Sequence, residues 1–149
     1  MRFCEAEEKA RYDVVVDLQP TSPLRKLKDL EGALNEFIDS KAHVLYSVVE
    51  SNKNPYFTMV ELDETGNAHL SKKIEGELFR RQDAPKVYAI NGSIYIYQRD
   101  HLLQAQGLHC DSERIFIMDE ISSIDIDSEL DFLFIEFLLK FGHFQFEQF

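Results

Sequence analysis

Residues 12–49 constrain the fold more than any other part of the chain. They begin with an apolar, β-branched run, Tyr12 to Leu18, and end with a second run, Val44 to Val49. Between the runs, apolar residues recur at the spacing of one helix face, at Leu27, Leu30, Leu34, Phe37 and Ile38. Continuous apolar strands are typical of strands buried on both faces of a parallel sheet. This order predicts a right-handed parallel crossover and therefore an α/β fold.

Shorter elements are expected on either side of this unit. Glu5 to Arg11 has the pattern of a helix tail. Ser22 is placed to cap the helix after the first strand, with Pro23 at its first position. Ser128 and Asp131 form a variant of the capping box before an apolar C-terminal helix. The region between is predicted to hold strands at Phe57–Leu62, Val87–Ile90, Ser93–Tyr97 and Arg114–Met118, a turn at residues 63–67 before another short strand, and a short helix at residues 100–106.

Length and charge limit the classes of protein to which the chain can belong. Its 149 residues suffice for a single domain with a real core, and 44% of them are apolar. The net charge of −11 argues against a nucleic acid partner, because neutralising phosphates along a duplex needs a basic face. Residues 1–9 lack the apolar core of a signal peptide, and no apolar run approaches a membrane span. These features predict a cytoplasmic protein without a membrane partner.

Cysteine and histidine positions show no metal-binding pattern along the chain. Cys4 and Cys110 are far apart and neither belongs to a C-x-x-C pair, which favours two free thiols over a disulfide or a zinc site. The five histidines also lack a spacing suited to a metal or a catalytic pair, and we interpret them as structural or exposed: they stand at positions 43, 69, 101, 109 and 143.

Two carboxylates, Asp125 and Asp127, stand one residue apart just before the last helix. In extended backbone this spacing puts both side chains on one face. Mg²⁺ often takes one or two carboxylates and completes its shell with water and substrate phosphate. The pair therefore suits a magnesium site, while a solvated loop or acids at a helix N-terminus explain it equally well.

Three further positions are candidates for ligand contact, each with a structural alternative. Gln19 lies where the first strand becomes a turn, which in an open α/β sheet faces the ligand crevice; the alternative is a surface residue beside a helix cap. Asn91-Gly92 is either a hairpin turn or a place where the backbone comes close to a ligand. Arg80 and Arg81 either grip a carboxylate or pair with surface acids.

Four segments follow one another in a characteristic order and approximate spacing: Leu18-Gln19-Pro20-Thr21-Ser22-Pro23-Leu24-Arg25, Arg81-Gln82, Asn91-Gly92-Ser93-Ile94-Tyr95-Ile96 and Asp125-Ile126-Asp127. Together they resemble the acylneuraminate cytidylyltransferases, also called CMP-sialic acid synthetases. The resemblance runs from about Tyr12 to Gly142, which is most of the chain. Residues 54–57 and 80–86 look closer to the members that act on legionaminic acid than to those that act on sialic acid.

The resemblance implies a fold and a reaction. The fold is a partial Rossmann-like nucleotidyltransferase fold, of the nucleotide-diphospho-sugar transferase type, with a mainly parallel sheet. In the reaction, the anomeric hydroxyl of a nine-carbon 2-keto sugar acid attacks the α-phosphate of CTP, pyrophosphate leaves and a CMP-sugar forms. Such chemistry needs in-line placement of the reactants and neutralisation of charge by Mg²⁺ and cations.

The resemblance also implies roles for individual residues, carried over by position. Asp125 and Asp127 would hold the metal, and Asp127 would also lie near the nucleophilic hydroxyl. Arg81 would act in catalysis and substrate binding by facing the sugar carboxylate. The other substrate-binding positions would be Gln19 and Tyr95, which touch the sugar, Asn91, and Ser22, which together with Arg25 supports the turn.

The family is usually homodimeric, and residues 68–110 of this chain resemble its dimerisation arm. Two departures from the family pattern stand out. The Gly-, Arg- and Lys-rich loop that cradles the triphosphate is absent upstream, so the chain corresponds to a sequence that starts about half-way through the nucleotide half. Two places before Asn91, where the family often has Arg, this chain has Ala89.

Three functions remain open at this point. The chain is part of an active cytidylyltransferase, or an inactive truncated fragment that only dimerises or binds the sugar acid, or an α/β interaction domain with chance motifs. The related cytidylyltransferase of 3-deoxy-octulosonic acid fits the Gln19–Pro23 turn poorly. Without a nucleotide half, apolar surface of the two long strands would be exposed, so we expect self-association or low stability.

Overall fold

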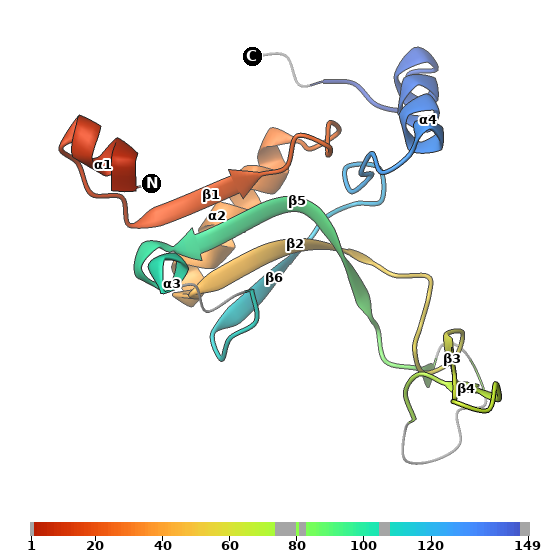
Figure 1. Cartoon of the computed structure of the whole chain (residues 1–149). Coiled ribbons are helices and arrows are strands. Elements are labelled where there is room, and N and C mark those ends of the chain that lie inside the picture. The colour runs from red at the N-terminus through yellow and green to blue at the C-terminus, as the bar shows by residue number, and fades with distance from the viewer. Residues whose placement is uncertain (1, 74–79, 81–82, 105–107, 147–149) are drawn as a thin grey trace. The chain divides into compact units, whose positions relative to one another are not determined.

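The computed structural model describes residues 2–73, 80, 83–104 and 108–146 (Figure 1). The chain divides into two compact units, Met1–Val49 together with Ile90–Phe149, and Glu50–Ala89. The first unit is built on a four-stranded sheet of β1 (Val14–Leu18), β2 (Val44–Glu50), β5 (Tyr88–Gln98) and β6 (Glu113–Ile117). Its helices are α1 (Arg2–Glu8), α2 (Leu27–Ser40), α3 (Arg99–Leu103) and α4 (Glu129–Lys140).

The strands lie in the order β1-β5-β2-β6. β1 pairs antiparallel with β5, with Val14 opposite Gln98, whereas β2 and β6 are parallel. Gln98 N–H donates to the His43 carbonyl (2.8 Å) and Ser51 N–H donates to the Val87 carbonyl (2.9 Å), so β5 also runs antiparallel to β2. The prediction of a mainly parallel sheet is therefore wrong. β1 and β2 run in the same direction, but β5 lies between them and runs in the opposite direction. The apolar composition of a strand does not determine the direction of the strand beside it.

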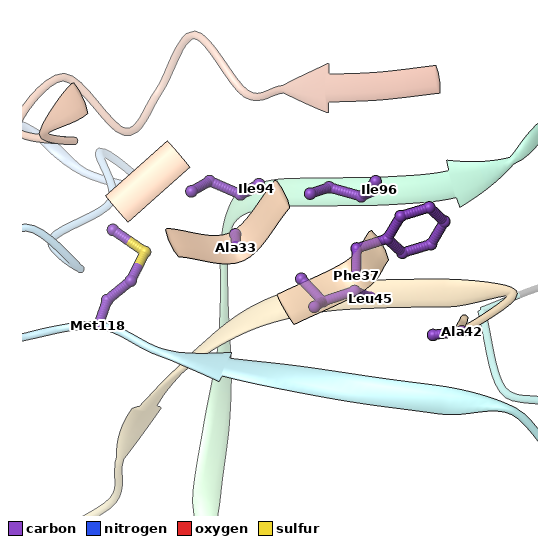
Figure 2. Close-up of a cluster of buried hydrophobic side chains, with 7 residues drawn as sticks. All are labelled: Ala33, Phe37, Ala42, Leu45, Ile94, Ile96 and Met118. Carbon is purple, nitrogen blue, oxygen red and sulfur yellow. The ribbon is translucent and has the colours of Figure 1, made fainter. Parts of the chain in front are cut away.

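β2 is buried on both faces, as its apolar run predicts. Figure 2 shows one face, where Ala33 and Phe37 of α2 cover Leu45 of β2 and Ile94 and Ile96 of β5. The opposite face packs Val44, Tyr46 and Val48 against Tyr95, Tyr97, Leu108 and Cys110.

β1 does not follow the prediction of burial on both faces. It is an edge strand, and Val16 and Leu18 are 38% and 40% exposed. An edge strand has a hydrogen-bonded neighbour on one side alone, so its apolar side chains are covered only as far as the adjoining elements reach. In β1, the apolar side chains of Val16 and Leu18 are therefore partly exposed at the edge of the sheet.

The turn between β1 and α2 is longer than the sequence predicts. Ser22 does not cap the helix; α2 begins at Leu27, after the N-cap residue Lys26. The Lys26 N–H donates to Asp29 Oδ2 (3.2 Å), so a side chain of the first helical turn satisfies this backbone donor at the start of α2. Ser22 is thereby released for a different contact, described below.

Two other boundaries are informative. β5 continues through Asn91-Gly92, so the hairpin alternative for this pair is wrong, and Gly92 has the positive φ of 70° that glycine adopts without strain. The capping box of the last helix is confirmed, because Ser128 N–H donates to Asp131 Oδ2 (2.8 Å) while the Ser128 hydroxyl accepts from Asp131 N–H.

The unit Glu50–Ala89 contains an antiparallel pair of short strands, β3 (Val60–Leu62) and β4 (Ala68–Leu70). The predicted turn between them is present, and Asp63 Oδ1 accepts hydrogen bonds from the N–H groups of Thr65 and Asn67. Residues 74–79, 81–82 and 105–107 of the predicted dimerisation arm lie outside the described residues. The arm itself stays a prediction.

Candidate functional site

The turn after β1 and the segment after β6 meet at one edge of the sheet. The Ser22 hydroxyl donates to Asp125 Oδ1 (3.3 Å), and the Ile126 N–H donates to the Thr21 carbonyl (2.9 Å). Ser22 is buried and Asp125 is partly buried. The two sequence motifs therefore lie side by side, although they are separated by most of the chain.

Arg25 ties the turn to the neighbouring strand. Its Nη2 donates to the Gln19 carbonyl (2.7 Å), and its Nε donates to the Ser93 hydroxyl of β5 (2.9 Å). The Gln19 N–H also bonds the Ser93 carbonyl (3.3 Å), so the turn has two attachments to β5. Burial of the guanidinium lowers the pKa of Arg25, which nonetheless stays a cation at neutral pH. Its position matches the supporting role that the family resemblance implies.

The Asn91-Gly92 pair approaches Asp125 from the side of β5. A Cβ atom on Gly92 would lie 3.7 Å from Asp125 Oδ2. The Asn91 side chain is buried and engaged: its Oδ1 accepts from the Ser47 hydroxyl (2.6 Å), and its Nδ2 donates to the Ser123 hydroxyl (2.9 Å). Asn91 thus joins β2, β5 and the segment that carries Asp125, and its contact with substrate remains a prediction.

Tyr95 lies within the electrostatic reach of two carboxylates. Burial first, and then the charges of Asp17 and Asp125, raise the pKa of Tyr95. Its ring is half-buried and stacks on Tyr97, with ring centroids 6.4 Å apart. The phenol is therefore held neutral beside the acidic end of the site, where it can donate a hydrogen bond to an anionic or hydroxylated ligand.

An ion pair that the sequence did not reveal lies in the same place. Lys26 Nζ contacts Asp119 Oδ2 at 2.7 Å, directly after β6. Partial burial raises the pKa of the Asp119 carboxyl, but hydrogen bonds from Lys26 and Ser122 outweigh it and hold that pKa well below its usual range. Asp119 comes just after the carboxyl end of β6, as Gln19 comes just after the carboxyl end of β1. The criterion that made Gln19 a candidate therefore applies to Asp119 as well.

A groove of about 410 Å³ adjoins the turn. Gln19, Ser22, Arg25 and Lys26 supply its polar wall. Its apolar wall comes from Leu18, Pro20, Pro23, Leu27, Leu30, Phe144 and Phe146. Two cations beside an apolar wall suit a small organic anion such as a sugar acid.

Two predicted site residues remain, Asp127 and Arg81. Asp127 is exposed, and its N–H donates to Asp131 Oδ2 (3.2 Å) at the start of α4. Arg81 lies outside the described residues. Within the described ranges, no third histidine, cysteine, aspartate or glutamate joins Asp125 and Asp127 in a metal-binding group. Two hard carboxylates fit Mg²⁺ where water and phosphate complete the shell.

No family model matches this sequence. Several individual proteins are similar to it in sequence. The post-translational flagellin modification protein B of Campylobacter coli is 38% identical over 132 residues, which are 89% of this chain and 55% of that protein. The CMP-N,N'-diacetyllegionaminic acid synthase of Campylobacter jejuni is 37% identical over 136 residues, 91% of this chain and 57% of that enzyme.

A third relative, the N-acylneuraminate cytidylyltransferase of Streptococcus agalactiae, is 28% identical over 116 residues, 78% of this chain and 28% of that enzyme. The chain belongs to the acylneuraminate cytidylyltransferase family. It spans about half the length of the first two curated relatives that it matches. In the described part of this family member, no helix is long and apolar enough to cross a membrane.

Proposed function

We propose that this chain carries the sugar-acid and metal part of a CMP-nonulosonic acid synthetase site on a nucleotidyltransferase fold. The complete site transfers CMP from CTP to the anomeric hydroxyl of a nine-carbon 2-keto sugar acid and releases pyrophosphate. The observation that carries the proposal is the contact between the Ser22 hydroxyl and Asp125 Oδ1, which joins the two motifs that the family resemblance assigns to sugar and metal.

The chemistry of the neighbouring groups supports these roles. Asp125 and Asp127 would hold Mg²⁺, which neutralises phosphate charge and orients the reacting groups when bound. Arg25 keeps the Gln19 turn against β5, so that the Gln19 side chain is presented beside the polar wall of the groove. Tyr95 offers a neutral hydroxyl, and Arg81 would pair with the sugar carboxylate.

We propose a legionaminic-type sugar acid as the substrate in preference to sialic acid. The support is the 37% identity to the diacetyllegionaminic acid synthase of Campylobacter jejuni, whereas N-acylneuraminate cytidylyltransferases are 27–30% identical and a second diacetyllegionaminic acid synthase, of Legionella pneumophila, is 28% identical. We also propose that the protein works as a homodimer through residues 68–110. The substrate preference and the homodimer are both inferred from the family relationship. The proposed sugar and metal site depends on neither of them.

Calorimetry with purified chain tests the proposal directly. Legionaminic acid and sialic acid are titrated separately, with and without Mg²⁺ and with CTP absent. We expect saturable binding, tighter for legionaminic acid, and at least a tenfold loss of affinity in Asp125→Ala, because a charged hydrogen-bond and metal partner is removed. Asp39→Ala, an exposed carboxylate on α2, is the matched control and keeps the affinity. No binding, or equal binding in both variants, contradicts the proposal.

A parallel assay of CMP-sugar formation separates the enzyme from a binding module. The 149 residues contain six glycines and no two are adjacent, so they hold no Gly-rich triphosphate cradle. We therefore expect the chain alone to bind sugar acid with little turnover. Mg²⁺-dependent turnover that Asp127→Ala abolishes would instead show that these residues suffice for catalysis. Sugar binding without turnover supports the alternative of a binding module for the chain by itself.

A further inference from the structure

A second group of chemically reactive side chains lies at the end of the sheet opposite the candidate site. β1 runs from Val14, opposite Gln98, to Leu18, opposite Ile94, so the Gln19 turn lies beside the middle of β5 and away from Gln98. His43 lies at the Gln98 end, where its carbonyl accepts from the Gln98 N–H (2.8 Å). Whatever this group binds is therefore separate from the sugar and metal site.

Three ligand-bearing side chains converge there: His43, His101 and Cys110. One ring nitrogen of each histidine and the Cys110 sulfur lie within 4.8 Å of one another. The histidine rings stack at 5.7 Å between centroids with 25° between their planes. His101 is buried, Cys110 is partly buried and His43 is exposed.

The three residues come from three separate segments. His43 precedes β2, His101 belongs to α3, and Cys110 precedes β6. The backbone of His43 is held on both sides, because its N–H donates to the Ser112 carbonyl (2.9 Å) and its carbonyl accepts from the Gln98 N–H. Cys110 packs on the apolar cluster of Val44, Tyr46 and Val48, which lowers the dielectric constant around its sulfur.

We propose that His43, His101 and Cys110 form a Zn²⁺ site with a fourth, solvent-facing coordination position. Two imidazoles and a thiolate are borderline and soft ligands, which suit Zn²⁺ and do not suit Mg²⁺ or Ca²⁺. Tetrahedral zinc with bonds of about 2.0–2.3 Å places its ligand atoms roughly 3.3–3.6 Å apart. The ligand atoms, which lie within 4.8 Å of one another, would therefore close by up to about 1.5 Å on metal binding. His43 is the most exposed of the three residues, and its ring, which stacks on that of His101, is the one that can move.

Metal bound here would fasten α3 and the segment before β6 to the start of β2. In this proposal the three residues act together, whereas the sequence suggested structural or exposed histidines and a free thiol; Cys110 is a free cysteine in the described structure. Their separation along the chain matches no short zinc motif, because each comes from a different element and only the sheet brings them together. The expected consequence is local and global stabilisation, since a ligand that binds the folded state alone shifts the folding equilibrium.

Cobalt and zinc titrations of the full 149-residue chain, under a reductant that contains no thiol, test the proposal. One equivalent of Co²⁺ is expected to give a thiolate-to-cobalt charge-transfer band, and one equivalent of Zn²⁺ to remove it. Cys110→Ser should abolish the band and weaken Zn²⁺ binding at least tenfold. Cys4→Ser, at an exposed position on α1, is the matched control and should keep both the band and the affinity.

His43→Gln distinguishes loss of the metal site from loss of the fold, because His43 is exposed and His101 is not. We expect His43→Gln to keep its metal-free melting temperature, to bind Zn²⁺ at least tenfold more weakly and to lose the Zn²⁺-dependent rise in melting temperature. The proposal is overturned if the wild-type chain gives no band, if Cys4→Ser loses it, or if His43→Gln binds Zn²⁺ as the wild type does. Tight Cu⁺ binding without any Zn²⁺ binding would also overturn it.

Discussion

The Ser22 hydroxyl donates to Asp125 Oδ1 over 3.3 Å and joins two residues that are 103 positions apart in the chain. Ser22 was predicted to cap a helix, and its hydroxyl is instead directed at the carboxylate that we assign to metal binding. The contact therefore fixes where Asp125 can point.

A double-mutant cycle measures this contact. We expect Ser22→Ala and Asp125→Ala each to lower the free energy of unfolding, with a coupling of about 1 kcal/mol between them, because each single change already removes the hydrogen bond. Urea denaturation of the four proteins gives the coupling. Strictly additive losses would show that the hydroxyl and the carboxylate do not interact.

Asn91 is expected to matter most for stability among the predicted site residues. Its buried amide bonds the Ser47 and Ser123 hydroxyls, so Asn91→Ala leaves several polar groups without partners. We expect a loss of about 3 kcal/mol in the free energy of unfolding. Asn35→Ala, at an exposed position on α2, is the control and should change it little. A loss in Asn91→Ala as small as that of the control would contradict the burial of this amide.

Gly92 has a positive φ of 70°, a backbone conformation that alanine tolerates poorly. Gly92→Ala should destabilise the protein by about 1–2 kcal/mol. Gly92→Asn should cost less, because asparagine enters the left-handed region more readily. Thermal and chemical denaturation of both variants decide the point. Equal losses would instead indicate that the added side chain presses on Asp125.

The pairing of Glu5 with Arg99 predicts a pH-dependent contribution to stability. The hydrogen bond from Arg99 lowers the pKa of Glu5 from 4.5 to about 2, and Arg99 Nη2 lies 2.7 Å from Glu5 Oε2. A carboxyl whose pKa is lower in the folded state stabilises the protein above its unfolded pKa and loses this effect as pH falls.

The stability difference between the wild type and Glu5→Gln should therefore be constant above about pH 5.5 and shrink between pH 4.5 and about 2. Unfolding free energies at several pH values measure it. Because Arg99 also pairs with Asp100 (2.9 Å), Asp100→Asn tests whether the effect belongs to Glu5. A difference that does not change with pH would refute the assignment.

The exposed apolar surface of the first unit predicts self-association. Helix α4 and its C-cap residue leave seven large apolar side chains more than a third exposed: Leu130, Phe132, Leu133, Phe134, Phe137, Leu139 and Phe141. Surface of this extent is usually covered by another chain or segment. We expect sedimentation velocity to show oligomers of the 149-residue chain at micromolar concentration, reduced in Leu133→Glu. A stable monomer would contradict this.

Local patterns predicted the parts of this protein that depend on neighbouring residues. The apolar run Val44–Val49, the Ser128–Asp131 cap and the turn after Asp63 all form as expected, because each is stabilised within a few residues. The family motifs, taken together, also indicated the relationship that the comparisons support.

The tertiary structure decided what depends on distant residues. The placement of β5 between β1 and β2 made the sheet mostly antiparallel. Other contacts between distant residues put Ser22 beside Asp125 and His43 beside His101 and Cys110. Strand order and the convergence of side chains depend on which distant surfaces pack against each other. A run of apolar residues predicts that a strand is buried, but it does not specify which strand lies beside it. The chain's own sequence thus specified its elements, whereas packing selected their partners and, through them, the chemistry of both sites.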